Sequence, residues 1–420
     1  MLMCLIINGT YIFNKLPIMR VVTKLFICLL SVHLFSACSD TTVSDGPYTF
    51  ADNLALINKL HNPIVLSNGA AQIIVLAEYQ GRVMTSTLNG TKGRSIGWVN
   101  HAHLAEKQEN PRVGGADRLW FGPEKGDFSL FFKPNTEQIP ENIVIPPAFS
   151  TVPFDVVSQS STHVSFSKKL TMENYRGFIF DLAVKRDISL FSNNEIKHDL
   201  GIEYNNLDAV AFGAQTTITN IGQKNWTKDT GLISIWDLGA FLPGEKSVAV
   251  IPTQANLAEV TSYFTPTQHS HTRIADGVVY YRANANYMNK IGIPPKNTLP
   301  IMASYNPQSG LFTVVTFQFD NTPNQLYVNS IWYPENHDNY NGDVINIFNH
   351  GGAYGAGTTG PFYELESSSH AKPLKIGDSQ SHFQNTYHFQ GDIEELNAIS
   401  LTLLGVSLQH IETAFDDAKK

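Results

Sequence analysis

A long succession of short strand-like runs, between about residues 63 and 389, constrains the fold of this chain most. Runs rich in Val, Ile, Phe, Tyr and Thr are separated by Gly, Pro, Asn and Asp, with no long helical pattern between them. Strands at this density favour antiparallel sheets packed face to face, so we predict a mainly β protein. The expected strands include residues 71–76, 128–132, 164–170, 178–184, 195–204, 214–220, 248–251, 277–282 and 311–317.

Helical patterns flank this β region. Residues 50–60 place apolar side chains on one face behind Asp52, which stands where an N-cap would. Residues 392–404 repeat apolar side chains at helical spacing, and residues 406–415 continue the pattern. No internal repeat and no Pro/Ser-rich linker marks a second domain. We therefore predict one β-sandwich domain over residues 50–420, with a short N-terminal helix and C-terminal helices.

The N-terminal tenth of the chain holds all three cysteines, Cys4, Cys28 and Cys38. A short basic segment, residues 19–24, precedes an apolar run, residues 25–35, of the length of a signal-peptide core. The following LFSAC resembles the lipobox of bacterial lipoproteins. This resemblance implies that residues 1–37 are a signal peptide, that Cys38 carries lipid, and that residues 38–49 form a tether. An ordinary cleaved signal or an anchor helix is the alternative.

The charge of the chain fits an exported protein that does not bind nucleic acid. Three of its 29 Lys and Arg, and none of its 37 Asp and Glu, precede residue 38, so processing leaves a net charge of −11. An acidic body repels a polyanion. With Ser39 rather than Asp after the lipidated cysteine, the pattern resembles that of lipoproteins sorted to the outer membrane. We expect a lipid-anchored protein of the cell envelope, in the outer membrane of a Gram-negative bacterium.

Acidic and basic side chains concentrate in residues 361–389. Side chains alternate between the two faces of a strand, so Glu364 and Glu366 share one face, about 7 Å apart along the backbone. After a turn, a second strand places His382 and His388 on one side. We predict an acid/base site in which Glu366 is the base, Glu364 raises its pKa, and a histidine is the acid. The histidine candidates are His382, His388 and His350; the alternative is that each is structural.

A second dense block, GGADRLWFGPE at residues 114–124, delivers polar and aromatic side chains after two glycines. Paired glycines permit positive φ or close backbone approach. Arginine beside an aromatic ring suits a sugar, because it combines hydrogen bonds to hydroxyls with stacking on the apolar face. The alternative is a β-bulge with a structural pair of Asp117 and Arg118. The predicted substrate-binding residues are Arg118, Trp120, Asp117, Glu124 and Trp236.

Two further motifs are not taken as cofactor or metal sites. GAGTTG at residues 355–360 has dinucleotide-binding spacing, yet Pro361 and a strand-like run follow it where that motif needs a helix. Residues 334–343 are rich in oxygen ligands, but aligned on Gly342 they lack the acidic residues of a regular calcium loop. A polar loop at the rim of a cleft is preferred there, and an irregular calcium site stays open. We predict neither a cofactor nor a metal.

Three segments carry a family resemblance: GGADRLWFGPE, TGLISIWDLGAFLPG and GPFYELESSS with the later LKIGD. They resemble a bacterial lipoprotein family of unassigned function and, more distantly, the galactose mutarotase-like superfamily. Aldose 1-epimerases carry Leu-Glu on a late strand before a polar run and a turn, and Leu365-Glu366 is similar. The resemblance implies a β-supersandwich, Glu366 as catalytic base and Arg118 as a ligand of sugar hydroxyls. The histidine acid of those enzymes has no counterpart at residues 234–238.

The sequence thus predicts a carbohydrate-binding lipoprotein whose site performs an acid/base step of the sugar-epimerase type. A polysaccharide lyase is one alternative, with an Arg or Asn neutralising a uronate and a Tyr or His abstracting a proton. A glycan-binding lipoprotein without activity is the other. The expected partners are a mono- or polysaccharide and, through Cys38, a membrane.

Overall fold

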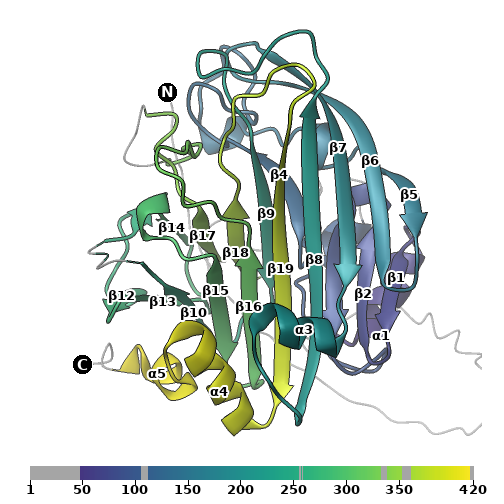
Figure 1. The fold of residues 1–420 in the computed structure, drawn as a ribbon, viewed down its shortest axis with the longest axis vertical. Coiled ribbons are helices and arrows are strands. Elements are labelled where there is room, and N and C mark those ends of the chain that lie inside the picture. Colours follow the sequence, from purple (N-terminus) through teal and green to yellow (C-terminus); the bar gives the residue numbers. More distant parts are fainter. Residues whose placement is uncertain are drawn as a thin grey trace, which may run out of the picture. The chain divides into compact units, whose positions relative to one another are not determined.

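Three antiparallel sheets form the β part of the chain in this computed structural model (Figure 1). The structure describes residues 48–105, 112–254, 257, 259–332, 338–351 and 361–416. The described residues belong to one unit, Pro47–Lys420. The predicted signal peptide, the lipidation site and residues 355–360 lie outside the described residues. The prediction of a mainly β, antiparallel fold is confirmed.

The strands of the three sheets are as follows. The ten-stranded sheet contains, in spatial order, β12 (Thr272–Ala275), β13 (Val278–Arg282), β10 (Val248–Pro252), β15 (Ile301–Asn306), β16 (Leu311–Phe317), β19 (Ser379–Gly391), β8 (Leu207–Asn220), β7 (Ile179–Leu190), β6 (His163–Glu173) and β5 (Asp155–Gln159). The six-stranded sheet contains β11 (Thr261–Ser262), β14 (Asn289–Ile293), β17 (Ile345–His350), β18 (Phe362–Ser368), β9 (Ser234–Phe241) and β4 (Arg118–Gly122). The three-stranded sheet contains β1 (Ile64–Asn68), β2 (Ala71–Leu76) and β3 (Arg82–Thr87).

Helices are short and lie between or after the strands. The α-helices of the described residues are α1 (Phe50–Asn58), α2 (His101–Ala105), α3 (Asn193–Leu200), α4 (Ile393–Leu404) and α5 (Leu408–Thr413). The 3-10 helices are η1 (Ala77–Tyr79), η2 (Pro140–Asn142), η3 (Pro147–Phe149) and η4 (Pro295–Asn297). Within this part of the chain, none of these helices has the length and apolar character needed to cross a membrane.

The ten-stranded and six-stranded sheets face each other, and period-two sequences build the layer between them. On β7 every even-numbered residue from Phe180 to Leu190 is buried, whereas the odd-numbered ones are partly or fully exposed. Contacts cross the layer: Ser304 on β15 lies 2.8 Å from the Tyr363 hydroxyl on β18. We call this layer the interlayer. Within the six-stranded sheet, β18 lies between β17 and β9, near the middle.

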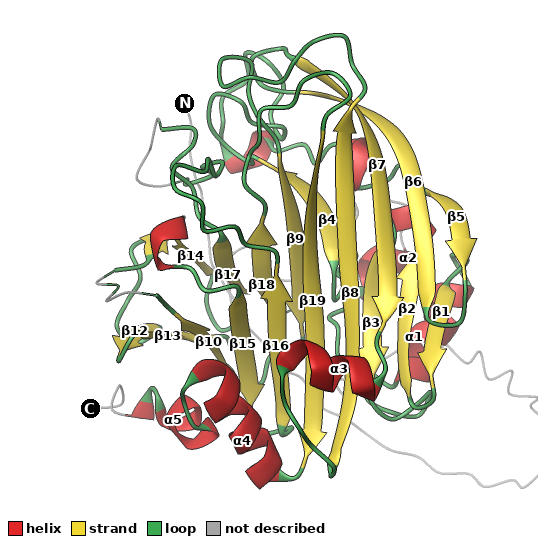
Figure 2. Cartoon of the chain, viewed as in Figure 1, coloured by secondary structure: helices red, strands yellow, loops and turns green. Residues whose placement is uncertain are grey.

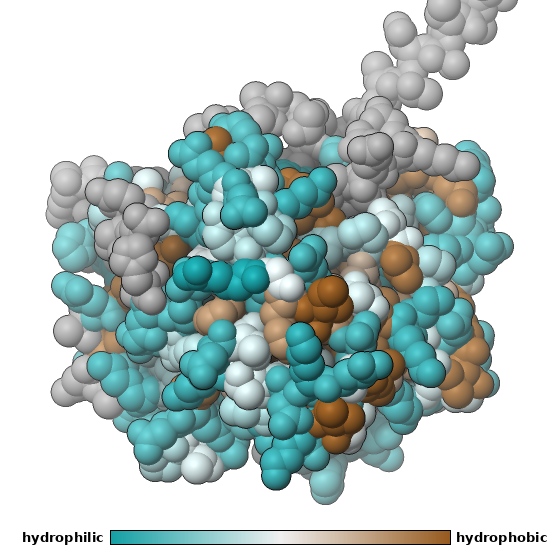
Figure 3. Space-filling model, turned by 90° about the horizontal axis from the view of Figure 1, so that it is seen from above, coloured by the Kyte–Doolittle hydropathy of each residue, from teal (hydrophilic) through white to brown (hydrophobic). Residues whose placement is uncertain are grey.

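Helices cover part of the other face of the ten-stranded sheet. Figure 2 shows α3, α4 and α5 against this sheet. Leu396 and Ile399 of α4 pack in one apolar cluster with Val250 on β10 and Phe389 on β19. The C-terminal helices therefore cap a sheet face, as their apolar spacing predicts. Seen from above the view of Figure 1, hydrophilic surface predominates and hydrophobic side chains form separate patches (Figure 3).

Three local predictions are wrong. The expected strand at residues 195–204 is largely α3, because Ser192 and Glu195 form a capping box and Gly201 ends the helix in the left-handed conformation. Residues 128–132 are a loop rather than a strand, and their backbone bonds go to other loop segments. Asp52 is not the N-cap of α1; that residue is Thr49, and Asp52 completes the capping box three positions later.

A buried ion network ties the two large sheets together. Arg186 on β7 is fully buried and forms ion pairs with Asp117 and with Asp237 on β9, the latter at 2.9 Å. Its guanidinium also donates to the Thr216 hydroxyl at 2.7 Å. Burial raises the pKa of Asp117 to about 7, against the lowering effect of Arg186. Removing the cation would therefore leave two buried carboxyl groups without their countercharge.

We expect Arg186→Met to lower the free energy of unfolding by about 3–5 kcal/mol, because breaking a buried pair exposes its partners' full desolvation cost. Arg176→Met is the matched control, since Arg176 and Asp127 form an exposed pair worth about 0–1 kcal/mol. Urea denaturation measures both. Equal, small losses in the two variants would contradict a stabilising role for the interlayer network.

Two histidines of β19 also lie in the interlayer. His382 Nε2 is 2.8 Å from Ser367 Oγ, and His388 Nδ1 is 2.9 Å from Thr313 Oγ1. Burial lowers the pKa of each imidazole to about 3. Both rings are therefore neutral when the chain is folded at neutral pH, while the unfolded chain takes up protons below about pH 6.5.

Stability must then fall as the pH drops from about 6.5 toward 3, because the unfolded state binds more protons over that range. We expect His388→Gln to remove part of this loss, up to about 1.4 kcal/mol per pH unit. Denaturation at a series of pH values tests it. The exposed His198 on α3 supplies the control, His198→Gln; an identical pH slope in the His388 variant and wild type would refute the assignment.

Candidate functional site

The face of the six-stranded sheet turned away from the interlayer collects the predicted glutamates. Cross-strand partners lie side by side on one face of a sheet. Glu366 is the partner of Leu238 on β9, which in turn is the partner of Arg118 on β4. Glu364 is the partner of Phe348 on β17, itself the partner of Lys290 on β14. We call this side of the sheet the outer face.

Glu364 and Glu366 are each paired with a cation. Arg118 Nη2 lies 2.7 Å from Glu364 Oε1, and Lys290 Nζ lies 2.7 Å from Glu366 Oε2. The Trp236 indole also donates to Glu366 Oε2, at 2.9 Å. Glu364 and Glu366 are 3% and 1% exposed, so both ion pairs are shielded from water. We call these two groups the carboxyl pair.

Burial changes the acidity of the carboxyl pair. It raises the pKa of Glu364 to about 7, and the negative charge of Glu366 acts in the same direction while Arg118 opposes it. Glu364 is thus poised to hold or release a proton near neutral pH.

Two atoms of this cluster are left without partners. Glu366 Oε1 and Arg118 Nε are buried and have no hydrogen-bond partner among the described residues. Glu366 Oε2 is already held by Lys290 and Trp236, so the carboxylate is fixed with its other oxygen unused. A buried acceptor and a buried donor without partners are each costly unless a ligand or water completes them.

Aromatic rings surround the charged groups. The Arg118 guanidinium lies 4.4 Å from the Trp120 ring, and Lys290 Nζ lies 4.4 Å from the Trp236 ring. Glu124 accepts a 3.1 Å hydrogen bond from the indole of Trp332. The partly exposed rings on this side are those of Trp120, Phe264, Trp332 and Phe348. They offer apolar faces next to the buried carboxyl pair.

The structure brings together most, but not all, of the residues predicted from the sequence. On the outer face, the carboxyl pair Glu364 and Glu366 lies near four other predicted residues: Arg118, Trp120, Trp236 and Glu124. Asp117 points into the interlayer, so the structural alternative of a pair with its neighbour Arg118 is wrong. The two preceding glycines, Gly114 and Gly115, do take positive φ, at 82° and 127°.

The histidines are not next to the carboxyl pair. His382 and His388 lie behind the six-stranded sheet, on the side of Ser367 rather than of Glu366. His350 is the cross-strand partner of Phe362, and its ring stacks on that of Phe362 with centroids 4.9 Å apart. Phe362 is four residues from Glu366, about 13 Å along the strand. Direct proton transfer from any of these imidazoles to a ligand on Glu366 has no support in this geometry.

Sequence reasoning missed Lys290 and Trp332. Lys290 belongs to a five-residue strand whose every residue is buried, and its partner lies 76 residues away in the chain. A charged side chain inside so apolar a run was the available signal, because a buried lysine needs a countercharge. Trp332 lies next to residues 333–337, which the description does not cover.

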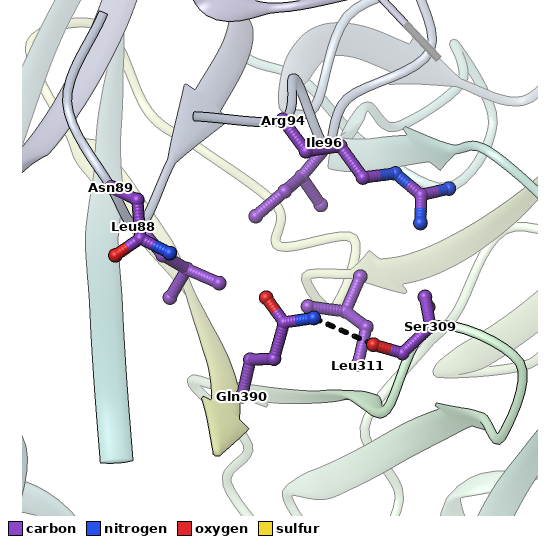
Figure 4. A pocket seen from close by; sticks show the side chains of 7 residues that line it. All are labelled: Leu88, Asn89, Arg94, Ile96, Ser309, Leu311 and Gln390. Atoms are coloured by element: carbon purple, nitrogen blue, oxygen red, sulfur yellow. Dashed lines mark hydrogen bonds between the residues drawn. The ribbon is translucent and has the colours of Figure 1, made fainter. Parts of the chain in front are cut away.

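Two hollows of the described residues lie away from the outer face. One lies between the segment after β3 and the strands β16 and β19, where Gln390 donates to the Ser309 carbonyl at 2.6 Å (Figure 4). Its volume of about 20 Å³ holds one water molecule. Another, of about 290 Å³, lies beside the start of α3. No group of three or more His, Cys, Asp or Glu in the described ranges could hold a metal ion.

Comparison with known proteins identifies a family without a known function. The model of the family of unknown function DUF6786 matches residues 48–415. A search of curated proteins finds no match.

Several solved structures are similar over most of the chain at low identity. A putative aldose 1-epimerase from Escherichia coli K12 is 12% identical, with 78% of this chain and 98% of that chain covered and a TM-score of 0.46. A protein from Synechocystis is 12% identical, with 79% and 96% covered and a TM-score of 0.48. A galactose mutarotase-like protein from Lactobacillus casei is 11% identical, with 78% and 100% covered and a TM-score of 0.46. Identities this low leave the activity open, whereas the family match spans nearly the whole described chain: the protein belongs to the family of unknown function DUF6786.

Proposed function

We propose that the outer face binds a carbohydrate and that Glu366 accepts a proton from it. The observation that carries this proposal is the unpartnered Oε1 of Glu366, on a carboxylate whose other oxygen is fixed by Lys290 and Trp236. A sugar hydroxyl is a donor of the size and polarity that such an acceptor takes. The sequence around Leu365 and Glu366 resembles a strand of aldose 1-epimerases, and this resemblance points to the same chemistry.

The surroundings of Glu366 suit a sugar in two further ways. Arg118, whose Nε lacks a partner, can donate to a second hydroxyl. Trp120 is partly exposed, and the Arg118 guanidinium lies 4.4 Å from its ring, so a sugar on Arg118 would meet this aromatic side chain. A few convergent polar groups among aromatic rings are typical of small-ligand sites.

A fixed carboxylate base also suits a sugar-epimerase step, in which the anomeric hydroxyl loses its proton while the ring oxygen gains one. The lyase alternative is less suited, because it needs a cation available to a uronate. Arg118 is already held by the Glu364 carboxyl group and Lys290 by the Glu366 carboxylate. Glycan binding without turnover would use the same contacts, and measuring turnover and binding separately distinguishes it from catalysis.

We expect Glu366→Gln to reduce the interconversion of aldose anomers at least about 100-fold, the usual contribution of a general base. Polarimetry on a panel of aldoses measures turnover. Tryptophan fluorescence measures binding, since Trp120, Trp236 and Trp332 line the site. Binding should persist, because the glutamine oxygen still accepts hydrogen bonds from Lys290 and Trp236.

Glu173→Gln, an exposed substitution of the same chemistry on β6, is the control and should match wild type in both assays. Undiminished turnover in the Glu366 variant would refute the assignment of the base. Sugar binding without turnover in the wild-type protein would establish the non-catalytic alternative. Binding of no sugar by the wild-type protein would refute the proposal as a whole.

We also propose that lipid on Cys38 holds the domain at the cell envelope, in the outer membrane if the cell has two. The support is the sequence pattern around this cysteine, which lies outside the described residues. Expressed in a Gram-negative host, the full chain should partition into detergent, and Cys38→Ala should abolish this partition. Cys28→Ala is the matched control. Unchanged detergent partition of the Cys38 variant would contradict lipidation.

A further inference from the structure

We infer that Glu364 is the proton donor of the site, so that acid and base stand two residues apart on the same strand. The inference rests on the proposed function and deepens it, since it names the group that the histidine candidates leave unfilled. Glu364 and Glu366 share the outer face of β18, and both are almost completely buried.

The charges on the outer face do not balance when every group is ionised. Among the described residues, Glu364, Glu366 and Glu124 lie near the cations Arg118 and Lys290. The half-buried Lys125, next to Glu124, is a third cation on this side and donates to the Trp332 carbonyl at 3.3 Å. Asp343, which accepts a 2.9 Å hydrogen bond from the Tyr263 hydroxyl, adds a fourth carboxyl near Lys290.

The other titratable groups facing this cluster do not restore the balance. Arg112 acts on Arg118 and Glu124 but is exposed to water, which screens its charge. Tyr263 stays protonated because burial raises its pKa well above 10, and burial lowers the pKa of His350. At least one carboxyl should therefore keep its proton.

The contacts of the carboxyl pair indicate where that proton resides. Glu366 Oε2 accepts hydrogen bonds from two donors, Lys290 and Trp236. Glu364 has the single donor Arg118 on Oε1. A proton on Glu364 can also reach Glu366 Oε1, which otherwise has no donor among the described residues. Burial and the neighbouring charge favour the protonated form of Glu364 up to about pH 7.

Adjacent acid and base groups can act on one anomeric centre, because the anomeric hydroxyl and the ring oxygen of an aldose are bonded to the same carbon. Glu366 takes the hydroxyl proton, and a carbonyl bond forms at the anomeric carbon. The bond from that carbon to the ring oxygen breaks, its electron pair stays on the oxygen, and Glu364 protonates it. After rotation of the aldehyde, the reverse transfers close the ring and return both protons, so nothing else is consumed.

The test uses the full-length protein labelled with carbon-13 at the glutamate carboxyls, which leaves Asp117 and Asp343 silent. In the wild type, one buried glutamate should titrate near pH 7 by NMR. Glu364→Gln should remove that signal, whereas Glu366→Gln should lower its midpoint, because a neighbouring negative charge is gone. Glu124→Gln should leave a signal near pH 7 in place. Absence of any such titration in the wild type, or its survival in the Glu364 variant, would overturn the inference.

Kinetics supply the second arm. Turnover should fall as the pH rises through about 7, where Glu364 loses its proton, and Glu364→Gln should reduce turnover at least about 100-fold while fluorescence still detects sugar binding. Full turnover in Glu364→Gln with loss in Glu366→Gln would overturn only the donor role and leave the proposed function intact. Absence of turnover or sugar binding in the wild type would instead refute the function and the donor role together.

Discussion

Alternation of side chains along β18 is the constraint on which the rest of the structure depends. Its odd-numbered residues face the interlayer, where Tyr363 and Ser367 bond to groups of the ten-stranded sheet. Its even-numbered residues, Glu364 and Glu366, consequently lie on the outer face. One strand thus contributes to the contact between the sheets and, through its other face, to a site. A shift of register by one residue would exchange the two roles.

The two faces solve the problem of buried charge in different ways. In the interlayer Arg186 is surrounded by Asp117, Asp237 and a hydroxyl, which joins the sheets. On the outer face Arg118 and Lys290 each contact one member of the carboxyl pair. The first arrangement is suited to structure, since Arg186 joins carboxylates that belong to the opposite sheet and its approach. The second keeps an unpaired oxygen on Glu366 beside partly exposed rings, which is suited to a ligand.

The sequence was sufficient to predict the fold class, the terminal helices and the shared face of the two glutamates, because period-two and helical spacing are local signals. It could not predict which strand faces which, so His382 was placed as a partner of Glu366 although the sheet separates them. For the same reason the sequence could not predict that the neighbours Asp117 and Arg118 point to opposite sides of the sheet. Lys290 was missed because its partner comes from a distant strand, and α3 because its caps outweighed strand-like composition.

The most direct measurement is a crystal structure of the protein with an aldose bound. We expect a sugar on the outer face, with one hydroxyl within hydrogen-bond distance of Glu366 Oε1 and the ring against an aromatic side chain such as Trp120. The ring oxygen or anomeric oxygen should lie beside Glu364. A sugar bound elsewhere, such as in the hollow beside α3, or one that leaves Glu366 Oε1 without a partner, would contradict this expectation.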